Sequence, residues 1–145
     1  MSPTEDHYRK LERMYASAPI NAFFQPRMRV SEGRAELEFE ARPEFFHAAH
    51  AMHGAAYFKA LDDASFFAAN SLIDDAFVLT VSYTVYLVRP VTGGTLRAVG
   101  KVVHRSRNLL LAEAELVNEE GKQVARGNGS FMPGRMPLSA DIGYA

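Results

Sequence analysis

The spacing of hydrophobic and polar positions changes several times along this chain. Residues 34–41 alternate between apolar side chains and glutamates, which predicts a half-exposed strand. Residues 54–71 are apolar almost all round, which predicts a helix that other structure must wrap. Four strand-like runs follow, at 77–88, 96–104, 109–117 and 123–132. The last run is rich in glycine, which predicts a bulge or an edge position.

Short connections between these runs imply antiparallel neighbours. The order predicts an α+β domain in which an antiparallel sheet of about five strands wraps around one long central helix. A short surface helix is expected before it, because Leu11, Met14 and Tyr15 recur at helical spacing and Pro19 ends the run. One sheet face would stay open, and dimerisation through an edge or face is the usual remedy.

Composition narrows the class of protein. The 145 residues fit one domain, 1–145, whose core spans about 28–133. A net charge of −1 does not suggest a nucleic-acid binder, and no apolar run is long enough to span a membrane. The charged N-terminus lacks the apolar region of a secretory signal. The absence of cysteine excludes disulfides and thiolate metal sites and fits a reducing cytoplasm, where we expect the protein to act.

The segment HGAAYFKALDDASFFAAN carries the candidate chemistry. It places Asp62 between Phe58 and Phe66 on the predicted buried helix, which opens at His53-Gly54. A carboxylate among aromatic rings suits base or nucleophile work. A helix N-terminus offers free N–H groups to a developing oxyanion. Together they suggest an enzyme that polarises a carbonyl group and hydrolyses it.

Three motifs in this order resemble one known family. They are His53-Gly54 with Asp62 nine residues after the histidine, Tyr86–Gly94 with its Arg-Pro and glycine turn, and the turn and strand at Glu119–Ala125. Over roughly 45–131 the chain is similar to hotdog-fold acyl-CoA thioesterases of the phenylacetic-acid-degradation type. The resemblance implies a hotdog fold and hydrolysis of an aromatic or medium-chain acyl-CoA to free acid and coenzyme A. It implies no cofactor other than the coenzyme A of the substrate.

The resemblance also implies site roles. Asp62 would act as general base or nucleophile, the N–H groups of Gly54 and Ala55 would polarise the thioester carbonyl, and Thr80 would help to hold the attacking water. Two positions depart from the family pattern, which usually has glycine where this chain has Ala55 and often asparagine where it has His47. Both departures bear on acyl specificity.

The other acidic and histidine residues near Asp62 are expected to have structural or orienting roles. Asp63 lies four residues after Lys59, so we expect an ion pair there and a structural role. The spacing of His47, His50 and His53 matches no metal motif, and we expect no metal. We expect His53 to orient the loop and the acyl carbonyl site.

Other side chains are candidate substrate contacts. His47 and Tyr57 are expected to line the acyl pocket, although Tyr57 is equally compatible with a plain core position. Arg105 and Arg107 are candidates for the phosphates of coenzyme A, because arginine binds phosphate well, and a solvated strand end is the alternative.

Helix geometry adds a prediction about assembly. At about 1.5 Å per residue, Asp62 lies about 12 Å along the helix from Gly54, too far to serve one carbonyl. The two groups must then come from different subunits, in a homodimer or a dimer of dimers with active sites at the interface.

Two other functions stay open. One is a non-catalytic acyl-CoA-binding module of the same fold. The other is a hydratase or dehydratase, which typically pairs the acidic residue with a catalytic histidine a few residues along the same segment. Here the first histidine after Asp62 is His104.

Overall fold

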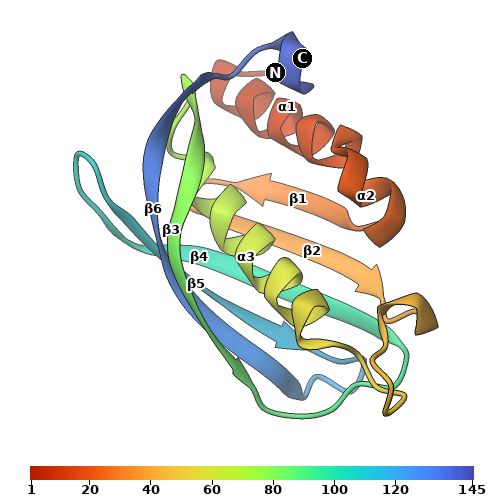
Figure 1. Cartoon of the computed structure of the whole chain (residues 1–145). Coiled ribbons are helices and arrows are strands. Elements are labelled where there is room, and N and C mark those ends of the chain that lie inside the picture. Colours follow the sequence, from red (N-terminus) through yellow and green to blue (C-terminus); the bar gives the residue numbers. More distant parts are fainter.

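The computed structural model describes all residues from 1 to 145 and shows a curved antiparallel sheet that holds one long helix in its concave face (Figure 1). The strand order is β1-β2-β4-β5-β6-β3. The strands are β1 (Arg27–Ser31), β2 (Arg34–Glu40), β3 (Ala76–Leu87), β4 (Thr95–Arg105), β5 (Leu110–Val117) and β6 (Gln123–Pro137). The helices are α1 (Pro3–Ser17), α2 (Pro19–Phe24) and α3 (Gly54–Asn70), with short 3-10 turns η1 (Pro43–Phe45) and η2 (Ala140–Ile142). This arrangement confirms the predicted α+β hotdog fold.

Helix α3 is buried because its sequence allows close approach on several sides. Ala60, Leu61 and Ala64 are fully buried against the sheet. Gly100 on β4 comes so close that an added Cβ would lie 2.4 Å from the backbone of Ala64. A side chain at that position would push the helix away from the sheet, so this glycine fixes the depth at which the helix lies.

The structure has one strand more than the five that the hydrophobic pattern predicts. The additional strand is β1, which is only five residues long and has just two apolar positions, Met28 and Val30. Arginines alternate there with these two apolar residues, but the run is too short to stand out in the sequence as a strand. Helix α2 was also missed, because Pro19 occupies a first-turn position in it rather than only ending the helix before it.

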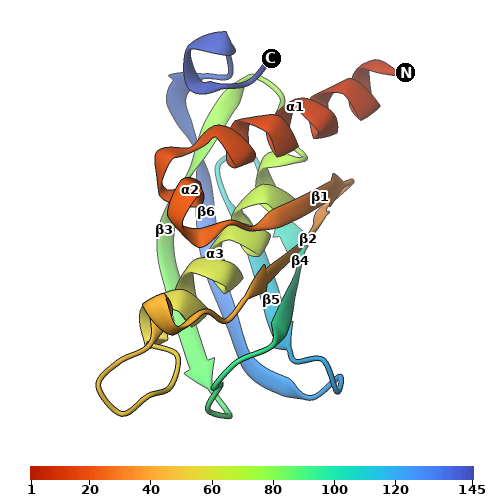
Figure 2. The same ribbon diagram turned by 90° about the vertical axis from the view of Figure 1, so that its right-hand side faces the viewer.

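Helix α1 is less peripheral than its short apolar pattern predicts. It runs for 15 residues and buries Tyr8, Leu11, Met14 and Tyr15. Seen from the side, it lies across one end of α3 and next to the C-terminal segment (Figure 2). The ring of His7 holds that segment through Tyr144, 2.7 Å away.

Strand β6 lies inside the sheet, between β5 and β3, and not at the edge that its glycines suggested. Gly127 and Gly129 are needed for a different reason. An added Cβ on either would lie within 2.4 Å of the ring of Tyr83, which packs over both. The expected irregularity is present, since the pairing of β3 with β6 shifts register between Thr80 and Ser82.

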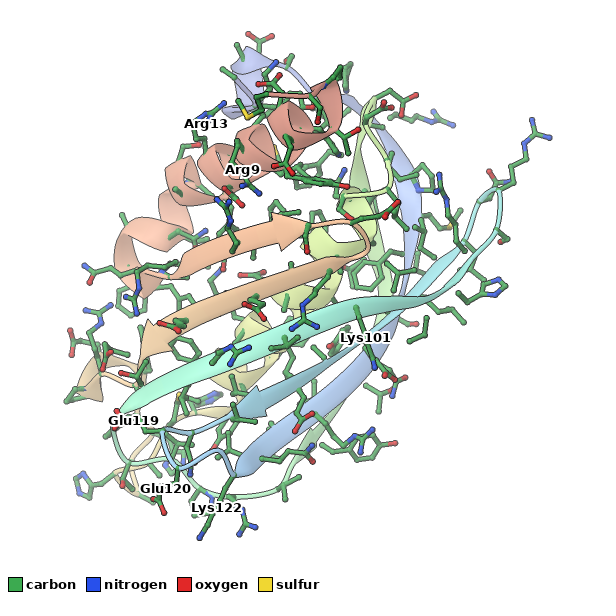
Figure 3. The ribbon with its side chains drawn as sticks, turned by 180° about the vertical axis from the view of Figure 1, so that it is seen from behind. Arg9, Arg13, Lys101, Glu119, Glu120 and Lys122 are labelled. Atoms are coloured by element: carbon green, nitrogen blue, oxygen red, sulfur yellow. The ribbon has the colours of Figure 1, made fainter.

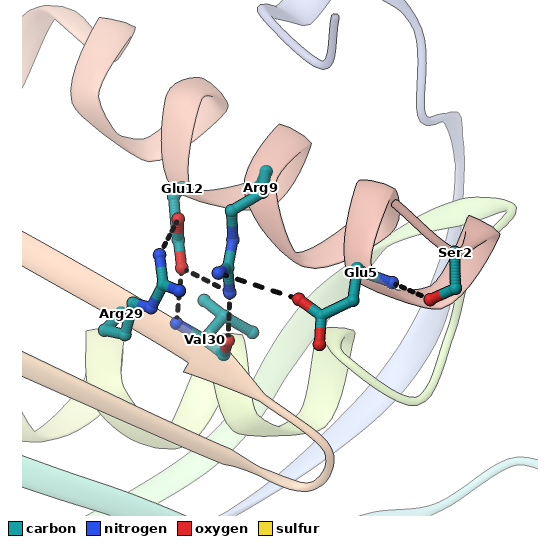
Figure 4. Close-up of polar contacts among 6 residues, drawn as sticks. All are labelled: Ser2, Glu5, Arg9, Glu12, Arg29 and Val30. Atoms are coloured by element: carbon teal, nitrogen blue, oxygen red, sulfur yellow. Dashed lines mark hydrogen bonds and ion pairs between the residues drawn. The ribbon is translucent and has the colours of Figure 1, made fainter.

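The two edges of the sheet differ. At the β1 edge, side chains of α1 bond the strand backbone: Arg9 donates to the Val30 carbonyl at 2.7 Å, and Glu12 accepts from the Val30 N–H at 2.8 Å (Figure 4). Arg29 also pairs with Glu12, at 3.6 Å. These contacts block the β1 edge against pairing with another strand.

Strand β3 forms the other edge, and the chain leaves it unpaired on its outer side. Four large apolar side chains on this strand are at least 54% exposed: Leu79, Val81, Tyr86 and Leu87. A free strand edge with exposed apolar side chains is a surface suited to association.

The convex face of the sheet carries no helix, as Figure 3 shows from behind. Lys101 on β4 pairs there with Glu113 on β5, at 3.6 Å. No helix of the structure has the length and apolar character needed to cross a membrane.

Candidate active site

Asp62 lies halfway along α3 and faces the free strand β3. Thr80 on β3 donates a hydrogen bond from its hydroxyl group to Asp62 Oδ1 at 3.0 Å. Burial, together with the smaller effect of the Asp63 charge, raises the pKa of Asp62 to about 6, while the Thr80 bond and the positive charge of Lys59 oppose that rise. The structure therefore brings together the predicted carboxylate and the predicted hydroxyl group, and leaves the carboxylate more basic than an ordinary aspartate.

Asp63 makes different contacts. Its Oδ2 accepts from Lys59 Nζ at 2.7 Å, which places the expected ion pair in the structure, and from the Tyr15 hydroxyl group at 2.6 Å. The side chains of Lys59 and Asp63 are each only 17% exposed. Burial raises the pKa of Asp63, while Lys59 and Tyr15 lower it. Asp63 thus ties α1 to α3 and accepts from two donors at one oxygen.

The N-terminus of α3 is capped by the residue before it. His53 Nδ1 accepts a hydrogen bond from the Ala55 N–H at 2.8 Å, which requires the ring proton to be on Nε2. The first N–H of a helix has no partner within the helix, and no other group of the chain accepts from the Gly54 N–H. Of the two predicted oxyanion donors, Gly54 is available and Ala55 is shared with His53.

Two cavities meet beside Asp62. One, of about 630 Å³, lies between α2, η1 and α3 and has the rings of Phe23, Phe24, Phe45, Phe46 and Phe58 in its walls. The other, of about 790 Å³, lies between α1, α3, the start of β3 and the C-terminal segment. Ile20, Lys59, Asp62 and Asp63 line both. A substrate group at Asp62 can therefore extend into either apolar space.

A smaller cavity of about 280 Å³ lies at the head of α3, and Gly54, His47, Tyr57 and Arg89 are among its lining residues. Tyr57 is 3% exposed, and its hydroxyl group donates to the Arg89 carbonyl at 2.7 Å. The exposed ring of His47 accepts from the Ala49 N–H at 3.1 Å. These two predicted substrate contacts thus lie on the Gly54 side of the helix and not beside Asp62.

Arg105 and Arg107 lie at the far end of the molecule from Gly54. Arg105 ends β4 and donates to the carbonyl of Leu72 at 3.1 Å, just beyond the C-terminal end of α3. Arg107 is exposed in the turn before β5. Through its contact with Leu72, Arg105 lies closer along the helix direction to Asp62 than to Gly54.

Sequence reasoning missed the walls that α1 and α2 contribute to the site. Tyr15 and Phe24 reach α3 from more than 30 residues away, and the ring centroids of both lie within 5.5 Å of Lys59 Nζ. One signal was present in the sequence: Pro19 followed by an apolar pair at Phe23 and Phe24 is compatible with a helix that starts at proline. No group of three or more histidine, aspartate or glutamate side chains converges in the structure.

Comparison with known proteins adds a family to this geometry. Residues 49–125 match a family model described as the thioesterase superfamily. A protein of Saccharolobus solfataricus that is named as an esterase is 25% identical over 129 residues, which cover 88% of this chain and 92% of that protein.

Solved structures agree with the fold. The E. coli PaaI protein, from the phenylacetic acid degradation operon, is 21% identical with a TM-score of 0.85, over 95% of this chain and all of that one. A thioesterase family protein from Silicibacter pomeroyi is 26% identical with a TM-score of 0.81, over 87% of this chain and 96% of that one. The conserved protein PA5202 of Pseudomonas aeruginosa is 27% identical with a TM-score of 0.76, over 83% and 98%.

Proposed function

This chain belongs to the thioesterase superfamily and is a thioester hydrolase with a PaaI-like hotdog fold, and on that premise we propose that its substrates are acyl-CoA thioesters. In this proposal Asp62 is the catalytic carboxylate. Gly54 supplies the oxyanion donor from the head of α3, and Thr80 positions Asp62 and the attacking water. The products are a free acid and coenzyme A.

The observation that carries this proposal is the environment of Asp62. The carboxylate accepts only one hydrogen bond from the chain, that of Thr80, and it borders two apolar cavities. With a pKa of about 6 it is ionised at neutral pH and still basic enough to take a proton. Its neighbour Asp63 is held by two donors and lacks that freedom.

The chemistry follows from these positions. A water molecule beside Asp62 attacks the thioester carbon and gives its proton to the carboxylate, and the carbonyl oxygen becomes an oxyanion that accepts from the Gly54 N–H. The C–S bond then breaks, and the thiolate takes the proton from Asp62. In the alternative route Asp62 attacks the thioester carbon directly and coenzyme A leaves as the thiolate. The resulting acyl anhydride is hydrolysed by water, which releases the free acid and restores the carboxylate. Both routes need the same two groups.

Within one subunit these groups are separated by eight residues of helix, about 12 Å along the axis. Phe58 lies midway between them and is the one large apolar side chain of α3 that is exposed, at 41%. If a second copy packs its α3 antiparallel across Phe58, Asp62 comes opposite Gly54 of the partner subunit. One two-fold axis therefore completes two active sites.

The sheet supports the same axis. The β1 edge is blocked by α1, whereas the β3 edge is free and apolar. The ring of Phe58 packs against Tyr83, in the middle of β3, with centroids 5.8 Å apart. Pairing of β3 with β3 of a second copy around that point would bring the two α3 helices together at Phe58. We propose a homodimer, or a dimer of such dimers, built this way.

The substrate contacts follow from the cavities. The phenylalanine-lined space beside Asp62 suits an aromatic or medium-chain acyl group. Arg105 donates to Leu72, which lies about 15 Å beyond Asp62 along the helix direction, and Arg107 follows in the exposed turn after β4. We propose that an extended pantetheine arm spans this separation and places its phosphates near the two arginines. Arg105 can serve both Leu72 and a phosphate, because a guanidinium carries five donors.

The test is thiol release from short, long and aromatic acyl-CoAs by the wild type and Asp62→Asn. We expect turnover on one acyl class and a loss of about 10²-fold or more in the variant. Asp74→Asn, an exposed loop aspartate, is the control for loss of a carboxylate. Undiminished turnover by Asp62→Asn would rule out the assignment of Asp62.

A further inference from the structure

Lys59 lies within reach of two carboxylates and pairs with only one. It precedes Asp62 by three residues and Asp63 by four, and both spacings permit an ion pair on a helix. The structure pairs Lys59 Nζ with Asp63 Oδ2 at 2.7 Å and forms no ion pair with Asp62. The choice between two adjacent carboxylates therefore needs a physical cause.

That cause lies in the helices that cover α3. Tyr15 on α1 donates to the same Asp63 oxygen at 2.6 Å, and it is held in turn against Phe67, with ring centroids 4.9 Å apart. The Lys59 ammonium lies 5.5 Å from the ring centroid of Tyr15 and 5.0 Å from that of Phe24, on α2. Two aromatic faces and a fixed carboxylate thus hold the cation on the side of Asp63.

The arrangement matters for Asp62 because of the charges beside it. A bare Asp63 carboxylate would disfavour ionisation of Asp62, and a bare Lys59 would pair with Asp62 and weaken it as a base. Held together, the two charges largely cancel at Asp62. A buried ion pair is also a poor source of stability compared with apolar side chains of the same size, so stability alone is a weak reason to have one here.

We propose that Lys59, Asp63 and Tyr15 form a charge-matched positioning unit that keeps Asp62 unpaired and reactive. The inference rests on the proposed role of Asp62 in thioester hydrolysis. The three residues are positioning residues, since none of them needs to touch the reacting atoms.

Other charged and titratable groups also face this region. They are His53 at the head of α3, Glu44 on η1, Tyr83 on β3 and Asp141 in the C-terminal segment. None forms an ion pair with Asp62 or a hydrogen bond to it. The immediate competition for Lys59 is thus between Asp62 and Asp63.

The test starts from Asp63→Asn, which is nearly isosteric and keeps an oxygen that can accept from Tyr15. It removes the like charge beside Asp62 and releases Lys59, and both changes favour the ionised form of Asp62. We therefore expect the acid limb of the pH profile, where kcat/KM falls as the pH is lowered, to shift to a lower pH by about one unit. In Lys59→Met/Asp63→Asn no cation is released, and the limb should return to its wild-type position. Asp6→Asn, which breaks the 3.2 Å Lys10–Asp6 pair of the same spacing on α1, is the matched control and should not move the limb.

A purely structural role of the unit would lower stability without moving the limb, and that result would overturn the proposal. A limb that stays low in the double variant would also overturn it. Carbon-13 NMR titration of the Asp62 carboxyl group, assigned with Asp62→Asn, gives a readout that needs no turnover. If that titration moves as expected while Asp62→Asn remains active, the proposed function fails and the positioning unit stands. If Asp62→Asn is inactive and the titration does not move, the positioning unit alone fails.

Discussion

The hydroxyl group of Thr80 donates a 3.0 Å hydrogen bond to Asp62 Oδ1 and so joins the free edge strand to the central helix at the candidate carboxylate. Further along β3, the Tyr83 hydroxyl group lies 2.8 Å from Ser65 Oγ and donates to the Leu61 carbonyl at 3.1 Å. These bonds hold β3 in a fixed position against α3. The orientation of Asp62 therefore depends on the same strand that we propose as the dimer interface.

Replacement of Thr80 by valine should make Asp62 harder to ionise. The hydrogen bond from Thr80 lowers the pKa of Asp62, so its loss raises that pKa above about 6. Activity that needs the ionised carboxylate is then lost at a higher pH, and the acid limb of kcat/KM should rise by roughly half a unit. Thr80→Ser retains the hydroxyl group and should keep the limb within measurement error. An unmoved limb in Thr80→Val would show that this bond does not act on the catalytic group.

Asp62→Asn should stabilise the protein while it abolishes activity. The pKa of Asp62 is raised from 3.8 to about 6 in the folded state, so ionisation costs stability that is lost progressively as pH rises through that window. The amide removes the cost. In chemical denaturation, the free energy of unfolding of the variant should exceed that of the wild type by about 1–2 kcal/mol at pH 8 and by almost nothing at pH 4. The gain at pH 8 is smaller than the full pKa shift implies, because the side chain is partly exposed and water screens its charge. Equal gains at both pH values would argue against a strained carboxylate.

Lys59→Met should have the opposite effect on stability. It leaves the carboxylate of Asp63 in a buried position with only Tyr15 as a donor. The loss should be about 3 kcal/mol at pH 8. The loss should shrink as the pH falls, because the pKa of Asp63 is raised by burial and rises further without Lys59, so that the carboxyl group takes up a proton. Adding Asp63→Asn should recover most of the loss, and a double variant as unstable as Lys59→Met would contradict this account.

Gly54→Pro tests the oxyanion donor with little change of shape. Gly54 is the first residue of α3, where proline fits, and His53 before it has the extended conformation (φ −67°, ψ 145°) that proline requires. The variant lacks the N–H group, and kcat should fall by about 10²-fold. Gly54→Ala keeps the N–H and adds a methyl group 3.4 Å from Leu87 Cδ1, so its kcat should stay close to that of the wild type. Similar kcat values for the two variants would exclude this N–H as the donor.

Local patterns in the sequence determined much of the fold. The all-round apolar run at 54–71 predicted the wrapped helix, and alternation at 34–41 predicted β2. The glycines of β6 were misread, because a glycine that admits the ring of Tyr83 looks the same in sequence as one that forms a bulge or an edge. Which meaning applies depends on a strand that lies some 45 residues earlier in the chain.

Part of the candidate site could likewise be predicted from the sequence, and part of it could not. Asp62, Thr80 and the head of α3 are close in sequence or fixed by motif spacing, and the structure places Asp62 and Thr80 in contact. The contacts of Tyr15 with Asp63 and of Phe24 with Lys59 could not be predicted, since no periodicity links α1 and α2 to a chosen face of α3. The capping of Ala55 by His53 was also missed, because it depends on a side-chain rotamer rather than on residue type.

The most direct test of the central claim, an active site shared between two subunits, is complementation between two inactive variants. Asp62→Asn and Gly54→Pro are each purified, unfolded, mixed in equal amounts and refolded, and thiol release from the best acyl-CoA is measured. Random pairing gives half hybrids, and each hybrid has one intact site of its two, so about a quarter of wild-type activity should return. Recovery near that value would show that Asp62 of one subunit works with Gly54 of the partner subunit. No recovery from a refolded mixture that contains hybrids would place both groups in one subunit and contradict the account.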